Sequence, residues 1–185
     1  MKLREAVKIL SDAGVPNPRY DARELFIRVG GMTFSELISA DAECEKEELI
    51  SAIERRKQRE PLQYIIGNVD FYRENYEVSP SCLIPRQDTE ILVDYAVKSI
   101  PAGARFLDLC TGSGCIAWTL ALEMPGAEVT AVDISDGALA VASSQDFSEE
   151  IARTGARAPE FIKADVLAGP SLAGQYDILV SNPPY

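Results

Sequence analysis

The feature that most restricts the fold of this chain is a regular alternation of apolar and helical segments that begins near residue 105. Four short apolar runs have the length and composition of buried strands, at residues 105–109, 128–132, 160–164 and 177–181. Helices are predicted between them at 115–123 and from Asp136 to about Thr154, where Gly155 supplies a stop. Strands that alternate with helices favour right-handed crossovers. The segment is therefore predicted to be an α/β domain whose parallel sheet is covered on both faces.

Residues 1–60 contain no such strands and instead repeat apolar residues at helical spacing. Helices are predicted for Leu3 to Leu10, for Arg19 to Val29, for a short segment opened by a capping box at Thr33–Glu36, and for Asp41 to Arg59. The last of these is acidic at its start and basic at its end, as the helix dipole prefers. The pattern predicts a small helical bundle.

The residues between the two parts predict a hairpin and a further helix. Residues 70–72 and 76–79 resemble two strands that turn at 73–75, and Asp88 is a suitable N-cap for a helix over 89–100. We therefore expect three domains, which are a helical domain at 1–67, a β-hairpin linker at 68–87 and an α/β domain at 88–185.

The charge of the chain is strongly acidic and unevenly distributed. The net charge is −11, and residues 61–185 carry 17 Asp and Glu against 7 Lys and Arg. Such a surface repels phosphate backbones, so we expect a protein or small-molecule partner and no direct binding of nucleic acid. No apolar run approaches the roughly 20 residues of a membrane span, and no signal peptide is recognisable. We expect a cytoplasmic protein without a membrane partner.

The chain has no histidine, and its four cysteines form no Cys-x-x-Cys pair. A histidine base is therefore excluded, and no metal site is expected because the usual zinc sites need clustered Cys or His ligands. Cys44, Cys82, Cys110 and Cys115 are expected to be reduced thiols in the core or in loops.

A glycine-rich loop, Asp108-Leu-Cys-Thr-Gly-Ser-Gly114, follows the first strand of the predicted sheet. Glycines there let the backbone turn tightly and approach a ligand. Asp133 ends the next strand, where a carboxylate can accept hydrogen bonds from both ribose hydroxyls of a nucleoside, and Asp165 ends the third, within reach of an adenine amino group. Open α/β sheets bind ligands at this edge. These features alone do not separate a nicotinamide cofactor from S-adenosylmethionine.

The motif Asn182-Pro-Pro-Tyr185 follows the last predicted strand and favours S-adenosylmethionine. An amide nitrogen is a poor nucleophile, so it must be held with its lone pair directed at the sulfonium methyl group. The Asn182 side-chain oxygen and the Pro183 carbonyl can accept its two N–H groups, and Tyr185 can stack on the planar amide and exclude water. This chemistry needs no obligatory general base. The simpler alternative is an Asn-Pro-Pro turn that ends an edge strand.

Five segments together resemble the protein-(glutamine-N5) methyltransferases that modify peptide chain release factors, a class I S-adenosylmethionine-dependent family. They are Pro61–Gly67, the Pro-Arg-x-x-Thr-Glu motif within Leu83–Glu90, the loop Leu107–Gly114, the pair Val132–Asp133 and the motif Asn182–Tyr185. The resemblance spans the whole chain. It implies a Rossmann-like class I methyltransferase sheet preceded by an N-terminal substrate-recognition domain.

The resemblance also implies a reaction and a set of residues. The reaction is methylation of the N5 nitrogen of the glutamine in the Gly-Gly-Gln motif of release factors, with S-adenosyl-L-methionine as cofactor and S-adenosyl-L-homocysteine as product. Catalysis is implied for Asn182, Pro183 and Tyr185, and Pro184 joins them in binding the glutamine. The implied cofactor-binding residues are Arg86, Thr89, Asp108, Cys110, Thr111, Gly112, Ser113, Gly114, Asp133, Ile134, Asp165, Val166 and Asn182.

Three departures from the family pattern carry expectations of their own. Cys110 stands where the loop often has glycine, which suits the loop if its backbone angles are ordinary. Val166 stands where an aromatic residue can stack on adenine. The chain supplies four of the seven strands of a class I methyltransferase sheet. We therefore expect a C-terminally truncated enzyme, inactive or nearly so alone, whose last strand is an unpaired apolar edge.

Several alternatives remain open from the sequence. A ribosomal-protein glutamine methyltransferase and an adenine-N6 DNA methyltransferase share the Asn-Pro-Pro-Tyr motif, although the acidic charge disfavours DNA and the linker motif favours the glutamine enzymes. A partner-binding module with a remnant cofactor fold would bind no S-adenosylmethionine. A nicotinamide-dependent oxidoreductase would bind NAD instead.

Overall fold

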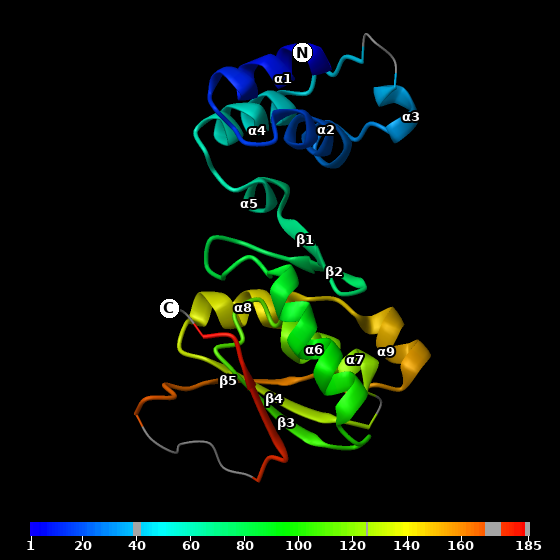
Figure 1. Ribbon diagram of the computed structural model, residues 1–185, viewed down its shortest axis with the longest axis vertical. Coiled ribbons are helices and arrows are strands. Elements are labelled where there is room, and N and C mark those ends of the chain that lie inside the picture. The colour runs from blue at the N-terminus through cyan, green and yellow to red at the C-terminus, as the bar shows by residue number, and fades with distance from the viewer. Residues whose placement is uncertain (39–41, 125, 169–174, 184–185) are drawn as a thin grey trace. The chain divides into compact units, whose positions relative to one another are not determined.

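The computed structural model describes residues 1–38, 42–124, 126–168 and 175–183 (Figure 1). The chain divides into two compact units, Met1–Gly67 and Asn68–Tyr185. The first unit is helical, and the second contains every named strand of the described ranges. Within these ranges no helix has both the length and the apolar character that crossing a membrane requires.

The described residues of the first unit form a bundle of α1 (Leu3–Asp12), α2 (Pro18–Arg28), α3 (Phe34–Leu37), α4 (Glu47–Lys57) and α5 (Leu62–Ile66). Apolar faces of the longer helices meet in its core, where Leu10, Leu25, Phe26, Leu49 and Ile53 are almost fully buried. The predicted helical bundle is confirmed.

Local side-chain hydrogen bonds and backbone angles determine where the helices of this unit begin and end. The predicted capping box of α3 is present, because Thr33 N donates to Glu36 Oε2 at 2.7 Å and Glu36 N donates to Thr33 Oγ1 at 3.3 Å. α4 begins later than predicted, at Glu47, because Lys46 is still extended. α5 is not predicted from the sequence. It ends at Gly67, whose φ of +89° lies in the left-handed region that glycine tolerates.

A buried ion pair joins α2 to α4. Arg56 Nε donates to Asp21 Oδ2 at 2.7 Å, and the two side chains are only 13% and 8% exposed. Arg56 Nη1 also donates to the Glu60 carbonyl at 2.8 Å. The guanidinium therefore fixes α2 and the end of α4 together.

Replacement of Asp21 with alanine is expected to lower the free energy of unfolding by about 2–3 kcal/mol, because the Arg56 guanidinium then lacks its carboxylate in a site largely closed to water. Urea unfolding followed by circular dichroism measures the change. Glu54→Ala removes a half-exposed pair with Lys57 and is the control, with little change expected. Equal losses in the two variants would contradict the structural role of the Asp21 pair.

The second unit is built on a parallel sheet of β3 (Arg105–Leu109), β4 (Glu128–Asp133), β5 (Glu160–Lys163) and β6 (Ile178–Ser181). The strand order β5-β4-β3-β6 places β6 at an edge (Figure 1). The predicted α/β fold and the edge position of the last strand are both confirmed. Leu179 of β6 is 60% exposed, so this edge strand carries exposed apolar surface, as predicted.

The helices of this unit are α6 (Gln87–Ser99), α7 (Cys115–Glu123), α8 (Asp136–Ser144) and α9 (Ser148–Thr154). All residues of α7 from Cys115 to Leu122 are buried, as expected for a helix that is apolar on nearly every side. The predicted helix 115–123 is confirmed. α7 therefore forms the centre of the core that supports the sheet.

The two faces of the sheet are covered differently. The larger core packs α6, α7 and α9 against one face, which includes Phe106 and Val129. On the other face Leu107, Val132 and Ala164 form a small cluster that contains no helix residue. The expected helical cover is thus present on one face only in the described ranges, because the described parts of the β5–β6 connection form no helix.

The predicted continuous helix 136–154 is wrong, because it is interrupted. α8 ends before Gln145, whose ψ of 127° is extended, and α9 begins three residues further on. Two interactions favour the break. The Gln145 side chain hydrogen-bonds backbone atoms of other segments, and the ring of Phe147 packs against Tyr76 and Trp118.

The predicted hairpin is present as β1 (Asn68–Phe71) and β2 (Glu74–Glu77), which pair antiparallel. Its turn lies at Tyr72–Arg73 and not at 73–75, because Asp70 and Asn75 pair within the ladder. The Asn75 side chain reinforces this register by donating from Nδ2 to Asp70 Oδ1 at 2.6 Å.

The start of α6 also differs slightly from the prediction. The helix begins at Gln87 after an extended Arg86, so Asp88 lies in the first turn and is not the N-cap. A carboxylate in the first turn still interacts favourably with the helix dipole. Glu90 Oε1 accepts a hydrogen bond from Tyr72 N at 3.1 Å and ties α6 to the hairpin turn.

Candidate functional site

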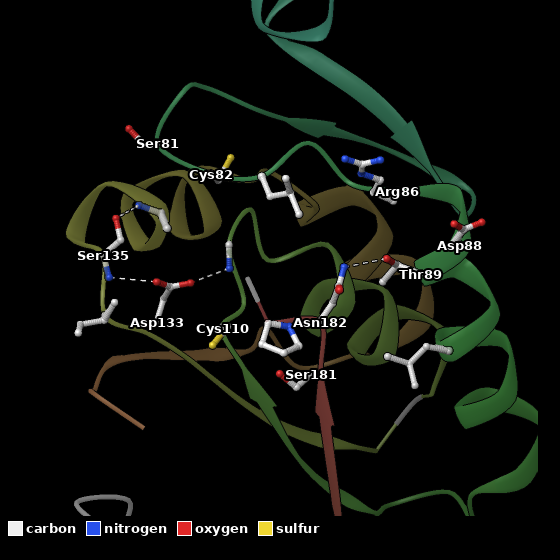
Figure 2. Close-up of a pocket in the computed structure, with 16 residues that line it drawn as sticks. Ser81, Cys82, Arg86, Asp88, Thr89, Cys110, Asp133, Ser135, Ser181 and Asn182 are labelled. Atoms are coloured by element: carbon white, nitrogen blue, oxygen red, sulfur yellow. Dashed lines mark hydrogen bonds between the residues drawn. The ribbon is translucent and has the colours of Figure 1, made fainter. Parts of the chain in front are cut away.

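The carboxyl ends of β3, β4 and β6 meet at a cavity of about 700 Å³ lined by 16 residues (Figure 2). β3 pairs with β4 on one side and with β6 on the other, so the cavity lies where the order of the strands reverses. Open α/β sheets bind ligands at such a point. The volume is within the range of small-molecule and cofactor sites.

Backbone hydrogen bonds hold the glycine loop against β4. Thr111 N donates to the Val132 carbonyl at 2.9 Å, and Gly112 N donates to Asp133 Oδ2 at 2.9 Å. Gly114 ends the loop with a φ of +80°, and a Cβ at this position would lie 3.0 Å from the Cβ of Ala142. The absence of a side chain therefore lets the loop approach α8 closely.

Asp133 is held by two backbone N–H groups. Its Oδ2 accepts from Gly112 N at 2.9 Å and its Oδ1 from Ser135 N at 3.0 Å (Figure 2). Each carboxylate oxygen has a second lone pair, so a fixed carboxylate still offers two acceptor positions. This arrangement suits a ligand with two adjacent hydroxyl groups.

Asn182 is oriented by the first turn of α6. Its Nδ2 donates to Thr89 Oγ1 at 3.0 Å, and its Oδ1 accepts no hydrogen bond from the described residues (Figure 2). Ser181 Oγ donates to the Leu109 carbonyl at 2.8 Å and fixes the end of β6 to β3. Asn182 therefore places an acceptor oxygen at the cavity in a defined orientation.

The structure brings together about half of the residues that the sequence assigns to the site. Lining the cavity are Arg86, Thr89, Cys110, Gly112, Asp133, Ile134, Asn182 and Pro183. Buried within the glycine loop and its strand are Asp108, Thr111, Ser113 and Gly114. Beyond the carboxyl end of β5, outside the lining, are Asp165 and Val166. Pro184 and Tyr185 lie outside the described residues.

Eight lining residues are not among those predicted from the sequence, namely Ser81, Cys82, Leu83, Asp88, Leu92, Ser135, Ala138 and Ser181. Some of them carry a usable signal. Leu92 is three residues from Thr89 on the same helix, and Ser135 follows Asp133 by two. Ser81 and Cys82 carry no local signal, because only the path of the connection after the hairpin brings them to the cavity.

Asp108 supports the glycine loop from inside β3, where its side chain is fully buried. Its Oδ2 accepts from Thr111 Oγ1 at 2.6 Å, and its Oδ1 has no partner within the described part of the chain. Burial raises the pKa of this carboxyl to about 7, against the opposing effect of the Thr111 hydrogen bond. Asp108 is therefore a buried titrating group next to the site.

Asp108 is expected to make stability depend on pH. The unfolded carboxyl releases its proton near the ordinary pKa of 3.8 and the folded one near 7, so its contribution is fully present below about pH 4 and is lost as the pH rises to about 7. Asp108→Asn removes this contribution. Thermal unfolding between pH 4 and pH 8 is expected to show a stability difference between variant and wild type that changes across this window. A constant difference would show that Asp108 does not titrate there.

Cys110 corrects an expectation drawn from the sequence. Its φ is +60°, so the backbone angles are not ordinary, and the residue lies in the left-handed region that favours glycine. A non-glycine residue there carries strain of about 1–2 kcal/mol. The cysteine is therefore held in the loop by its surroundings and not by its own preference.

Cys110→Gly is expected to raise the free energy of unfolding by about 1 kcal/mol, since relief of the left-handed strain outweighs the extra freedom of glycine in the unfolded chain. Urea unfolding measures the gain. Cys110→Ala keeps the Cβ and removes only the thiol, so it is expected to give no gain. Equal gains in both variants would assign the effect to the thiol and not to the backbone.

A parallel α/β sheet with a glycine loop and a fixed carboxylate at its carboxyl edge defines a Rossmann-like cofactor-binding protein. The chain belongs to the methyltransferase small domain family, whose model matches residues 87–185. Residues 2–67 match the model of the PrmC N-terminal domain.

Curated relatives extend this assignment. A release factor glutamine methyltransferase of Koribacter versatilis is 41% identical over 97% of this chain and 64% of its own length. Another, of Bacteroides thetaiotaomicron, is 46% identical over 77% of this chain and 49% of its own length. The matches thus span about half to two thirds of these relatives. The predicted resemblance to glutamine methyltransferases is confirmed. The crystal structure of TrmN from Thermus thermophilus is also similar, with a TM-score of 0.41 and 29% identity over 51% of this chain and 28% of that one.

Proposed function

We propose that the protein methylates the N5 nitrogen of a glutamine side chain in peptide chain release factors and uses S-adenosyl-L-methionine as the methyl donor. The main support for this proposal is the position of the Asn182 amide. Thr89 orients this amide, and Asn182 and Asp133 line the same cavity. The names of the curated relatives support the choice of substrate.

The lining of the cavity fits S-adenosylmethionine better than a dinucleotide. Asp133 offers two acceptor positions to ribose hydroxyls, and Ile134 beside it offers an apolar surface to adenine. Arg86 can pair with the carboxylate of the methionine part. The charged lining residues Arg86, Asp88 and Asp133 sum to a single negative charge, which complements the single net positive charge of this cofactor. The pyrophosphate of NAD would be repelled.

When bound, S-adenosylmethionine supplies an electrophilic methyl group and leaves as S-adenosyl-L-homocysteine. Asn182 Oδ1 and the Pro183 carbonyl accept the two N–H groups of the substrate amide, which directs the nitrogen lone pair at the methyl carbon. The methyl group would pass from the sulfonium to this nitrogen, and the methylated amide would lose one N–H proton to water. No histidine base is required, because the alkylated amide is strongly acidic before it loses that proton.

Further roles in this reaction follow from the sequence. Pro184 helps to bind the glutamine side chain, and Tyr185 stacks on the amide group of that side chain. The Asp165-Val166 corner receives the adenine edge, next to Asp133, whose carbonyl accepts a hydrogen bond from Ala164 N at 3.0 Å. The helical domain at 1–67 recognises the release factor, the hairpin linker at 68–87 joins it to the cofactor domain at 88–185, and the protein acts in the cytoplasm.

Methyl transfer by the complete gene product tests the proposal. Radiolabelled S-adenosylmethionine is offered with a release factor, a ribosomal protein or DNA in separate reactions, and mass spectrometry locates the modified residue. Label in the glutamine of the Gly-Gly-Gln motif is the expected result. Label confined to the ribosomal protein or to DNA would overturn the substrate. No label in any reaction, with the cofactor bound, would overturn the activity.

A further inference from the structure

One wall of the cavity comes from a segment without regular structure. We call residues 78–86, between β2 and α6, the connecting segment. It contributes Ser81, Cys82, Leu83 and Arg86 to the lining. Figure 2 shows Ser81 and Cys82 on one side of the cavity and Cys110 of the glycine loop on the other. The separation of the connecting segment and the glycine loop therefore sets the width of the cofactor site.

One side chain hydrogen-bonds both to the glycine loop and to Glu77, the residue that precedes the connecting segment. Gln145 follows α8 and is 6% exposed. Its Oε1 accepts from Glu77 N at 2.9 Å, and its Nε2 donates to the Glu77 carbonyl at 2.9 Å. The same Nε2 donates to the Ser113 carbonyl of the glycine loop at 3.2 Å. Gln145 therefore holds the residue that precedes the connecting segment and the glycine loop with one planar amide.

A second contact guides the connecting segment along α8. Gly137, in the first turn of this helix, lies so close to Ser81 that a Cβ at Gly137 would be 2.9 Å from both Cβ and Oγ of Ser81. Gln145 acts at the other end of α8. The connecting segment thus begins directly after Glu77, which Gln145 holds at one end of α8, and passes close to Gly137 at the other end.

We propose that Gln145 is a positioning residue for S-adenosylmethionine: its amide sets the separation between the connecting segment and the glycine loop. This inference rests on the proposed function for its ligand. Gln145 does not line the cavity, so it acts only through the backbone groups that it holds. Loss of its amide removes the hydrogen bonds that it makes to the N–H and carbonyl of Glu77, which are partly buried, and to the Ser113 carbonyl, which is buried. The Ser113 carbonyl then gains a water partner only if the glycine loop moves away from residue 145.

Two variants of nearly equal volume separate hydrogen bonding from packing. Gln145→Met keeps the size and removes the polar atoms. Gln145→Glu keeps an acceptor for Glu77 N and turns a second oxygen towards the Glu77 and Ser113 carbonyls. Both are expected to weaken binding of S-adenosylhomocysteine about tenfold or more in calorimetry. Ser144→Ala is the matched control, because within the described residues Ser144 bonds only the Glu77 side chain and its own helix. This variant is expected to bind S-adenosylhomocysteine like wild type.

The opposite end of the segment supplies a test that leaves every polar atom of Gln145 in place. Gly137→Ala improves helix propensity and forces Ser81 away, so weaker binding is expected in a well-folded protein. The double variant Gly137→Ala with Ser81→Gly removes the clashing atoms and is expected to recover affinity. Affinity that is unchanged in Gly137→Ala, or in both Gln145 variants, would overturn the inference.

A measurement without ligand separates this inference from the proposed function. In hydrogen–deuterium exchange, the amides of residues 78–86 and 111–114 are expected to exchange faster in Gln145→Met and Gln145→Glu than in Ser144→Ala. Unchanged exchange overturns the coupling through Gln145. If wild type shows the coupling but binds neither S-adenosylmethionine nor S-adenosylhomocysteine, the choice of cofactor fails and with it the ligand named here.

Discussion

Replacement of Asn182 with alanine is expected to lower the turnover number for methyl transfer about 10³-fold, because the substrate amide loses the acceptor that directs its lone pair. The structure provides the reason for so large an effect. Asn182 is not a loosely placed side chain, since Thr89 fixes its Nδ2 at 3.0 Å and Ser181 fixes the end of its strand. Cofactor affinity is expected to change less than about fivefold, the effect of a single neutral hydrogen bond. Single-turnover kinetics and calorimetry measure the two quantities.

Substitutions at Thr89 test whether orientation is the cause. Thr89→Ser keeps the hydroxyl that accepts from Asn182 Nδ2, whereas Thr89→Val keeps the shape and removes it. The valine variant is expected to lose about tenfold in turnover and the serine variant to retain most of it. Equal turnover of the two variants would show that Thr89 does not orient Asn182. Full turnover of Asn182→Ala would remove the Asn182 side chain from the mechanism.

Burial explains how much of the fold could be predicted from the sequence. The strand at 105–109 is found at the predicted residues because β3 lies between two strands, so its apolar side chains Phe106 and Leu107 are both buried, on opposite faces of the sheet. The interruption of the helix 136–154 has no comparable signal. It depends on contacts of Gln145 and Phe147 with segments more than 30 residues away in sequence, which periodicity cannot reveal.

The site, too, contains residues whose position follows from the topology and features that the sequence does not predict. Asp133 and the glycine loop could be predicted because topology alone places the ends of parallel strands at one edge. Asn182 could be predicted for the same reason, whereas its hydrogen bond with Thr89 could not, because Thr89 is 93 residues away in the sequence. Two features of the site are properties of the folded backbone, namely the φ of Cys110 and the approach of Ser81 to Gly137. They cannot be predicted from the residue types at these positions.

Replacement of Asp133 with asparagine is expected to weaken binding of S-adenosylmethionine by about 10²–10⁴-fold, because two charge-assisted hydrogen bonds to the ribose are lost at about 1.5–3 kcal/mol each. The loss should be nearly as large as in Asp133→Ala. Gly112 N and Ser135 N each donate to one of its oxygens, and an asparagine can supply an acceptor to only one of them. Its amide group would oppose the other N–H and displace either the glycine loop or the turn into α8.

Asp136→Asn is the matched control for this substitution. Asp136 lies three residues further along and pairs on the surface with Lys163, where the two side chains are 79% and 56% exposed. It lies outside the cavity lining, so its variant is expected to bind the cofactor like wild type. Calorimetry gives both affinities, and thermal unfolding with and without S-adenosylhomocysteine gives an independent value through ligand-linked stability. If Asp133→Asn and Asp136→Asn bind equally well, the cofactor ribose does not lie on Asp133, and the placement of S-adenosylmethionine in this cavity is wrong.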